Sequence, residues 1–200
     1  MDRHPRHAPA TLRNRDAILS ILKTLVPDRG LLLEIASGTG EHAAHMTPRL
    51  PPALVWQPTD AAPNALADID AHTAGCESIR PALLLDTRMP SWPVPRADII
   101  LCCNMIHIAP WEAALGLFAG AARILPTGGA LVLYGPFRRQ GLHTAPSNAE
   151  FDRSLRARDT SWGVRCLDSE VRPAAAAVGL EFAAEHSMPA NNLIIVLRRT

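Results

Sequence analysis

Hydrophobic residues follow two different spacings along the chain, and their order predicts alternating helices and strands. Helices are expected over residues 16–26, 41–50, 63–74, 111–125 and 168–178, each stopping near a proline or glycine. Short apolar runs predict strands at residues 31–35, 54–60, 82–86, 97–103 and 130–134, and two more are expected at 180–187 and 192–198.

The repeated strand-helix units predict a doubly wound α/β fold, because each right-handed crossover returns the chain to the same sheet with its strands parallel. The short link at residues 188–191 favours an antiparallel pair for the last two strands. We expect a single domain over residues 1–200, with a flexible N-terminal arm at 1–12. The polar segment 135–167 breaks the alternation and is expected to be a lid or acceptor loop.

The composition is that of a globular protein, with 48% apolar and 20% charged residues. Twenty Lys and Arg against 19 Asp and Glu give a net charge of +1, which argues against nucleic acid as a partner. The polar N-terminus lacks a secretory signal, and no apolar run is long enough to span a bilayer, so we expect a cytoplasmic protein without a membrane partner. Nothing in the pattern indicates an oligomeric state.

The histidines and cysteines do not have the spacing of a metal site. His42 and His45 share a helix face beside Glu41, but the order Glu-His-x-x-His matches no known zinc-protease arrangement and no third ligand is placed. The adjacent Cys102 and Cys103 lie in an apolar strand and are expected to pack in the core. We therefore predict no metal.

The strongest candidate for chemistry is LLLEIASGTGEH, residues 31–42, where a buried strand delivers an acid and then small residues to a helix start. Small residues let the backbone approach a ligand, and the N–H groups of the turn point outward. Asp60 lies 20 residues beyond Gly40, where a carboxylate can accept both ribose hydroxyls of an adenosine ligand. With Glu34 and Asp86, it places three acids at one crevice edge.

These residues, together with the fourth strand ending in Asn104-Met105-Ile106-His107, resemble class I S-adenosylmethionine-dependent methyltransferases. Over nearly the whole chain, the segments around Arg13-Asn14, SGTGEH, WQPTD, NMIHIAPW, YGPF, SNAEFD, WGVR and MPANN are similar to a family of largely uncharacterised methyltransferase-like proteins.

The resemblance implies a seven-stranded, mostly parallel sheet with an antiparallel C-terminal hairpin, and S-adenosylmethionine as cofactor. It places Glu34 beneath the methionine end, Asp60 on the ribose and Asp86 toward the adenine amine. Many members of the superfamily have glycine where this chain has Ala36. The residues expected at the cofactor are Glu34, Ala36, Ser37, Gly38, Gly40, Asp60, Asp86, Asn104 and Met105.

A nicotinamide dinucleotide is the competing ligand, because Gly38, Gly40 and Ala43 also fit the Gly-x-Gly-x-x-Ala fingerprint. Glu34 favours adenosylmethionine: an acid suits the positive amino and sulfonium groups, whereas a pyrophosphate would be repelled by it.

Residues for the acceptor are less specific. His107 is a candidate catalytic base for a hydroxyl or thiol, or it merely packs at the strand end. The expected acceptor residues are Tyr134, His143, Asn148, Trp162, Asn191 and Asn192. Alternatively, Ser147 caps the next helix, the asparagines satisfy turn backbone and Trp162 packs under the loop. The arginines of this segment fit an anionic acceptor or, more usually, a solvated face.

The sequence therefore predicts a methyltransferase that acts on a compact small molecule by in-line transfer. Asn104 lacks the Asn-Pro-Pro-Tyr pattern of many nucleic-acid and protein amide methylating enzymes. The alternatives are a non-catalytic module that binds adenosylmethionine or adenosylhomocysteine and acts through a protein partner, and a protein side-chain methyltransferase.

Overall fold

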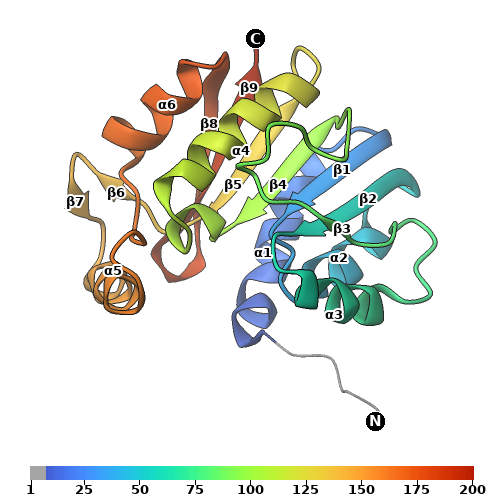
Figure 1. The fold of residues 1–200 in the computed structure, drawn as a ribbon, viewed down its shortest axis with the longest axis horizontal. Coiled ribbons are helices and arrows are strands. Elements are labelled where there is room, and N and C mark those ends of the chain that lie inside the picture. Colours follow the sequence, from blue (N-terminus) through green and yellow to red (C-terminus); the bar gives the residue numbers. More distant parts are fainter. Residues whose placement is uncertain (1–7) are drawn as a thin grey trace.

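The structure, a computed structural model, describes residues 8–200 and contains one seven-stranded sheet in the order β3-β2-β1-β4-β5-β9-β8 (Figure 1). The strands are β1 (Arg29–Ile35), β2 (Ala53–Asp60), β3 (Leu83–Leu84), β4 (Ile99–Cys103), β5 (Ala130–Gly135), β8 (Leu180–Met188) and β9 (Asn192–Arg199). Strands β1 to β5 are parallel, and β9 is antiparallel to both of its neighbours. The predicted doubly wound α/β fold with an antiparallel C-terminal hairpin is confirmed.

Helices cover both faces of this sheet. The helices are α1 (Pro9–Leu25), α2 (Glu41–Met46), α3 (Pro63–Thr73), α4 (Trp111–Ile124), α5 (Pro146–Arg158) and α6 (Arg172–Ala176). Short 3-10 turns lie at Thr47–Arg49, Met105–His107 and Pro189–Asn191, and a π turn at Leu167–Val171 leads into α6. Within residues 8–200, no helix has the length and apolar character needed to cross a membrane.

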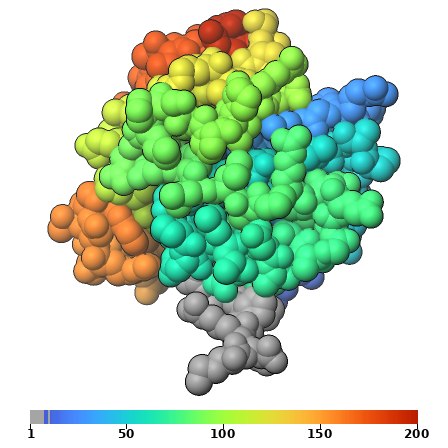
Figure 2. All heavy atoms as spheres, turned by 45° about the vertical axis from the view of Figure 1, so that its right-hand side comes forward, coloured from blue at the N-terminus to red at the C-terminus, as the bar shows by residue number. Residues whose placement is uncertain are grey.

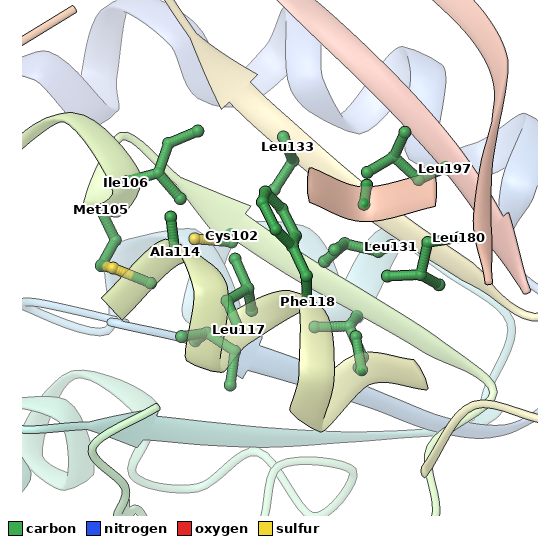
Figure 3. Close-up of a cluster of buried hydrophobic side chains, with 14 of the residues drawn as sticks. Cys102, Met105, Ile106, Ala114, Leu117, Phe118, Leu131, Leu133, Leu180 and Leu197 are labelled. Carbon is green, nitrogen blue, oxygen red and sulfur yellow. The ribbon is translucent and has the colours of Figure 1, made fainter. Parts of the chain in front are cut away.

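Alternate residues of the central strands enter two separate cores, which is why these strands are apolar throughout. On the face of α1 and α2, Leu32, Leu101 and Val132 pack against Ile18 and Leu22. The opposite core gathers side chains of α4 and the strands (Figure 3), including Leu117, Phe118, Leu131, Leu133 and Leu197. Packing on both faces holds the parallel strands in place. Their carboxyl ends therefore lie together at one edge of the sheet, and the polar candidate residues follow those ends.

Two glycines let α4 lie directly on the segment that follows β3. A β-carbon at Gly116 would overlap the Thr87 carbonyl oxygen and lie 2.8 Å from its carbon, and one at Gly120 would overlap the Trp92 ring. The Thr87 hydroxyl donates to the Ala113 carbonyl (2.7 Å), which ties the same segment to α4. The position of residues 87–92 is therefore set by the small size of α4 residues.

Part of the segment expected to be a flexible N-terminal arm is helical. Helix α1 begins at Pro9, so residues 9–12 are helical, and Pro9 at the first helical position explains the start. The expectation for residues 1–7 lies outside the described residues.

The segment 135–167, expected to be a lid or acceptor loop, contains more regular structure than a loop. It contains the two-stranded hairpin of β6 (Arg138–Arg139) and β7 (Leu142–His143), followed by the 13-residue helix α5. Helix α5 is polar on most of its surface, with Leu155 buried and Phe151 partly exposed, so its apolar stripe is too narrow to indicate a helix. Figure 2 shows the orange part of the chain that includes α5 at the lower left of this face.

Candidate functional site

The predicted acids and the small-residue turn meet at the carboxyl edge of the parallel strands. The turn follows β1 and is fastened to β2, because the Ser37 N–H donates to the Thr59 carbonyl (2.8 Å) and the Thr59 hydroxyl donates to the Glu34 carbonyl (2.7 Å). Asp60 ends β2 and accepts from the Gly38 N–H (2.9 Å). Gly38 is exposed, with no atom within 4 Å of a β-carbon built there, so the turn faces open space.

Ala36 has a left-handed backbone, with φ of 57°. This conformation costs a residue with a β-carbon roughly 1–2 kcal/mol, which gives a physical reason for glycine at this position in related proteins. The chain keeps the turn despite that cost, and the Ala36 methyl becomes part of the wall of a small cavity described below.

Glu34 is almost fully buried and accepts two hydrogen bonds on one carboxylate oxygen, from the Ser37 hydroxyl (2.8 Å) and the Trp56 indole N–H (3.0 Å). Its other oxygen lies 3.8 Å from His42 Nδ1. Burial raises the pKa of Glu34 to about 7, although both hydrogen bonds act in the opposite direction. The carboxyl therefore titrates near neutral pH and is sensitive to any positive charge placed beside it.

Asp86 follows β3 and is already paired. Arg88 donates to both of its oxygens, at 2.6 Å from Nη2 to Oδ2 and 3.0 Å from Nε to Oδ1. These hydrogen bonds lower the pKa of Asp86. The pair borders a cavity of about 100 Å³ whose apolar wall includes Ile35, Leu85 and Met105. We call it the smaller cavity.

Asn104 follows β4 in a left-handed conformation (φ 60°), which asparagine tolerates better than most residues. It does not line the smaller cavity. It lines a second cavity of about 560 Å³, which lies between α1, the ends of β4 and β5, α5 and the turn before β9. We call this the larger cavity, and its volume is within the range of small-molecule sites.

The catalytic role considered for His107 is not supported, because the side chain is fully buried and lines neither cavity. Its Nδ1 accepts from the Arg165 backbone N–H (3.3 Å), and its ring meets Phe137 edge-on at 5.0 Å. Burial, with help from the Arg165 charge, lowers the pKa of His107 to about 3. It remains neutral and acts as a packing residue.

Three of the six expected acceptor residues, Tyr134, Asn148 and Asn192, line the larger cavity. The other three do not. His143 Nε2 lies 3.5 Å from an Asp152 oxygen, and Trp162 packs beneath the Arg158 guanidinium. Asn191 instead donates to the Ser147 hydroxyl (3.3 Å).

The alternative roles considered for these polar residues are partly correct. Asn148 donates to the Asn191 carbonyl (3.0 Å), so an asparagine does satisfy turn backbone, and Trp162 packs against its surroundings. Ser147 is not a helix cap: α5 begins at Pro146 after Ala145, without a side-chain cap.

The larger cavity also contains residues that sequence reasoning did not assign to a site, among them Arg13, Asn14, Phe151 and Pro189. Arg13 and Asn14 come from α1, more than one hundred residues from Tyr134, so no local pattern connects them. The one available signal was the presence of the Arg13-Asn14 pair among the family-like segments.

The arginines of segment 135–167 contact other groups. Arg138 pairs with Glu170 (3.0 Å), Arg139 with Glu185 (2.6 Å) and Arg156 with Asp152 (3.1 Å). The buried Arg165 donates to the Ile106 carbonyl (2.9 Å). These four side chains stabilise the structure around α5 and do not line the larger cavity.

The two candidate histidines of α2 bond to polar side chains of α1. His42 Nε2 bonds to the Asn14 side-chain oxygen (2.9 Å), and His45 Nε2 bonds to Asp16 (2.7 Å). Within residues 8–200, no group of three or more His, Cys, Asp or Glu side chains could hold a metal. Burial raises the pKa of Cys102 to about 12, so this thiol is unreactive in the core.

Solved structures with this architecture are methyltransferases. The O-methyltransferase family 2 protein from Planctomyces limnophilus DSM 3776, solved with apigenin, matches with a TM-score of 0.78 at 21% identity, over 94% of this chain and 57% of its own. Human N-acetylserotonin methyltransferase, solved with S-adenosylmethionine, matches with a TM-score of 0.77 at 15% identity, over 95% of this chain and 52% of its own.

The methyltransferase CalO1 of calicheamicin biosynthesis, solved with S-adenosylhomocysteine bound, matches with a TM-score of 0.72 at 20% identity, over 92% of this chain and 54% of its own. The chain thus spans little more than half the length of each of these three proteins. The family model described as "Protein of unknown function (DUF938)" matches residues 5–199. The chain belongs to that family, and it has the fold of the class I S-adenosylmethionine-dependent methyltransferases.

Proposed function

We propose that this chain is an S-adenosylmethionine-dependent methyltransferase that acts on a small-molecule acceptor. The observation that carries the proposal is the placement of Glu34, Asp60 and Asp86 around the left-handed turn at one sheet edge, next to a cavity of about 560 Å³. In the solved structures with this fold, adenosylmethionine and adenosylhomocysteine are the ligands named for human N-acetylserotonin methyltransferase and CalO1.

The residues present fit this cofactor. Asp60 lies beside the open turn and offers carboxylate oxygens to ribose hydroxyls. The smaller cavity combines apolar walls from Ile35, Leu85 and Met105 with the Asp86 carboxylate, a combination suited to a flat ring that bears an amine. Arg88 must release part of its contact with Asp86 for that carboxylate to accept from the amine. Glu34 supplies negative charge beneath the turn.

The cofactor, when bound, supplies a methyl group on a positively charged sulfur. The chain has to align the acceptor and exclude water from it. Among the described residues lining the larger cavity there is no Asp, Glu, His, Cys or Lys, so these residues supply no carboxylate, imidazole, thiol or amine as a general base. Burial raises the pKa of Tyr134, which keeps its hydroxyl protonated and able to donate. We therefore expect the methylated atom to carry an unprotonated electron pair at neutral pH.

Removing the Asp60 carboxylate tests the cofactor assignment. Adenosylmethionine and adenosylhomocysteine should each raise the melting temperature of the parent protein by several degrees, and NAD should not. In Asp60→Asn, which keeps an oxygen for the Gly38 N–H, both affinities should fall about tenfold or more through loss of a charged acceptor. Thermal shift and calorimetric titration measure these effects.

Asp28→Ala is the matched control, because Asp28 is exposed and lies just before β1, at its opposite end from Glu34. Its affinity should equal that of the parent. A shift with NAD alone would replace the proposal with a dinucleotide enzyme. Cofactor binding without release of adenosylhomocysteine across a panel of small acceptors would instead favour a non-catalytic binding module.

A further inference from the structure

Tyr134 is one of the residues that line the larger cavity, whose walls come from distant parts of the chain. Tyr134 lies near the end of β5, and Asn104 follows the neighbouring strand β4. Because β9 is antiparallel, its first residues lie beside the end of β5, with Leu193 opposite Gly135. Helix α1 contributes Arg13 and Asn14. Asn104 thus joins this cavity to the sheet edge that carries the three acids.

Arg13 is the one charged side chain among the described residues lining the larger cavity. It is exposed, and no ion pair connects it to a carboxylate within residues 8–200. Arg138, Arg139 and Arg156 differ in this respect, since each pairs with an acid. A cation on a cavity wall that pairs with no carboxylate of the described residues can offer its N–H groups to an anion.

The groups beside Arg13 also favour negative charge. Burial raises the pKa of Tyr134, but hydrogen bonds from the Asn14 and Asn192 side chains and the positive charge of Arg13 act against that effect. Each of the three stabilises an anionic oxygen at this position. The Tyr134 hydroxyl itself remains protonated at neutral pH, so a bound anion would find donors from several directions.

Part of the remaining wall is apolar, and Asn104, Ser147 and Asn148 are its polar residues. Phe151 of α5 is 36% exposed, and Pro136, Pro189 and Ala190 complete this side of the cavity. Apolar surface opposite a cation is the arrangement that binds a hydrocarbon or aromatic body with an acidic substituent.

We propose that the acceptor is a small organic carboxylate, held by Arg13 and the Tyr134 hydroxyl with its apolar body against Phe151. The proposal rests on the methyltransferase function proposed above and names its substrate class. It agrees with the lack of such a base among the described residues that line the cavity, since a carboxylate oxygen needs no deprotonation at neutral pH. In transfer to that oxygen, its electron pair forms the bond to the methyl carbon, and the pair of the broken carbon-sulfur bond stays on sulfur.

The first test compares probes of equal shape and different charge on the protein saturated with adenosylhomocysteine. Benzoate should bind the parent about tenfold more tightly than benzamide. Phenyl phosphate serves as a third arm, because a phosphate could use the same donors. Arg13→Ala should lose the preference for benzoate over benzamide, and Arg13→Lys should keep part of it. Calorimetric titration provides the dissociation constants.

Two controls distinguish a failure of the carboxylate proposal from a failure of the proposed methyltransferase function. Lys23→Ala removes an exposed cation from the same helix and should keep the preference for benzoate. Arg13→Ala should still bind adenosylhomocysteine like the parent, which also shows that it folds.

If the parent does not bind adenosylhomocysteine, the proposed function fails. If it binds adenosylhomocysteine but benzoate no better than benzamide, or if Arg13→Ala keeps the preference, the carboxylate proposal is overturned. Tighter binding of phenyl phosphate than of benzoate overturns the choice of carboxylate and assigns the site to phosphate esters.

Discussion

Replacing Glu34 with glutamine is expected to raise the free energy of unfolding by about 2 kcal/mol at pH 8. Burial raises the pKa of Glu34 to about 7 from 4.5, so the folded protein holds an extra proton between these values. Stability linked to this group is complete below pH 4.5, falls as the pH rises to 7, and stays reduced above that. The shift corresponds to at most about 3 kcal/mol.

Glutamine is neutral throughout this range and can still accept from the Ser37 hydroxyl and the Trp56 indole. Denaturant unfolding of parent and variant between pH 5 and 8 should therefore give a stability difference that increases with pH. The exposed Glu181 provides the control Glu181→Gln, for which the difference should stay near zero. A stability difference that does not change with pH would show that Glu34 is charged in the folded protein throughout.

The same substitution should weaken adenosylmethionine binding about tenfold at pH 8, since the proposed role of Glu34 is to face its positive groups. Parent affinity should also rise between pH 6 and 8 as Glu34 loses its proton, and the variant should lack this rise. Greater stability with poorer binding is the signature of a charge retained for function. Equal affinity of both proteins would contradict the role assigned to Glu34.

Gly116→Ala should lower the melting temperature by roughly 5 °C, the reverse of the usual effect of this change within a helix. Alanine normally stabilises a helix by about 1 kcal/mol relative to glycine. Here the added β-carbon would overlap the Thr87 carbonyl oxygen, and backbone cannot rotate away as a side chain can. Overpacking of this kind costs about 1–3 kcal/mol, and it should displace the adjoining Arg88 and weaken adenosylmethionine binding.

Leu115→Ala is the control within the same helix, because Leu115 is 43% exposed and points away from this contact. Its melting temperature and its affinity for adenosylmethionine should change little. Thermal unfolding and calorimetry measure both variants. A Gly116→Ala protein that melts above the parent would mean that α4 can move off the segment 87–92 without loss.

The sheet was predictable because its determinants are local. Residues 31–35 form a run that is apolar except for Glu34, which is typical of a strand buried on both faces, and the spacing from Gly40 to Asp60 places that acid at the end of the next strand. Helix α5 was not predictable in this way, since its exposed surface leaves few apolar positions and its stability depends on packing of residues such as Leu155.

The site was predictable only where neighbouring residues along the chain define it. His107 follows a strand at the expected edge, but Arg165 and Phe137, which bury it, come from parts of the chain that no local pattern places beside it. Arg13 is the converse case: it lines the larger cavity because of how α1 packs, although no pattern near it in the sequence indicates a site. Burial and wall position are tertiary properties, and spacing alone does not encode them.

The origin of the two cavity walls matters for anyone who redesigns this protein by directed evolution. The smaller cavity is built from residues 35–113, whereas Ser147, Phe151 and Ala190 of the larger cavity come from the C-terminal third. A mutant library at those three positions can vary the lining of the larger cavity without changing any residue that lines the smaller cavity. Asn14 does not belong in such a library, because it lines the larger cavity and also bonds His42, the neighbour of Glu34. Substitutions of Asn14 would therefore alter the larger cavity and the surroundings of Glu34 at once.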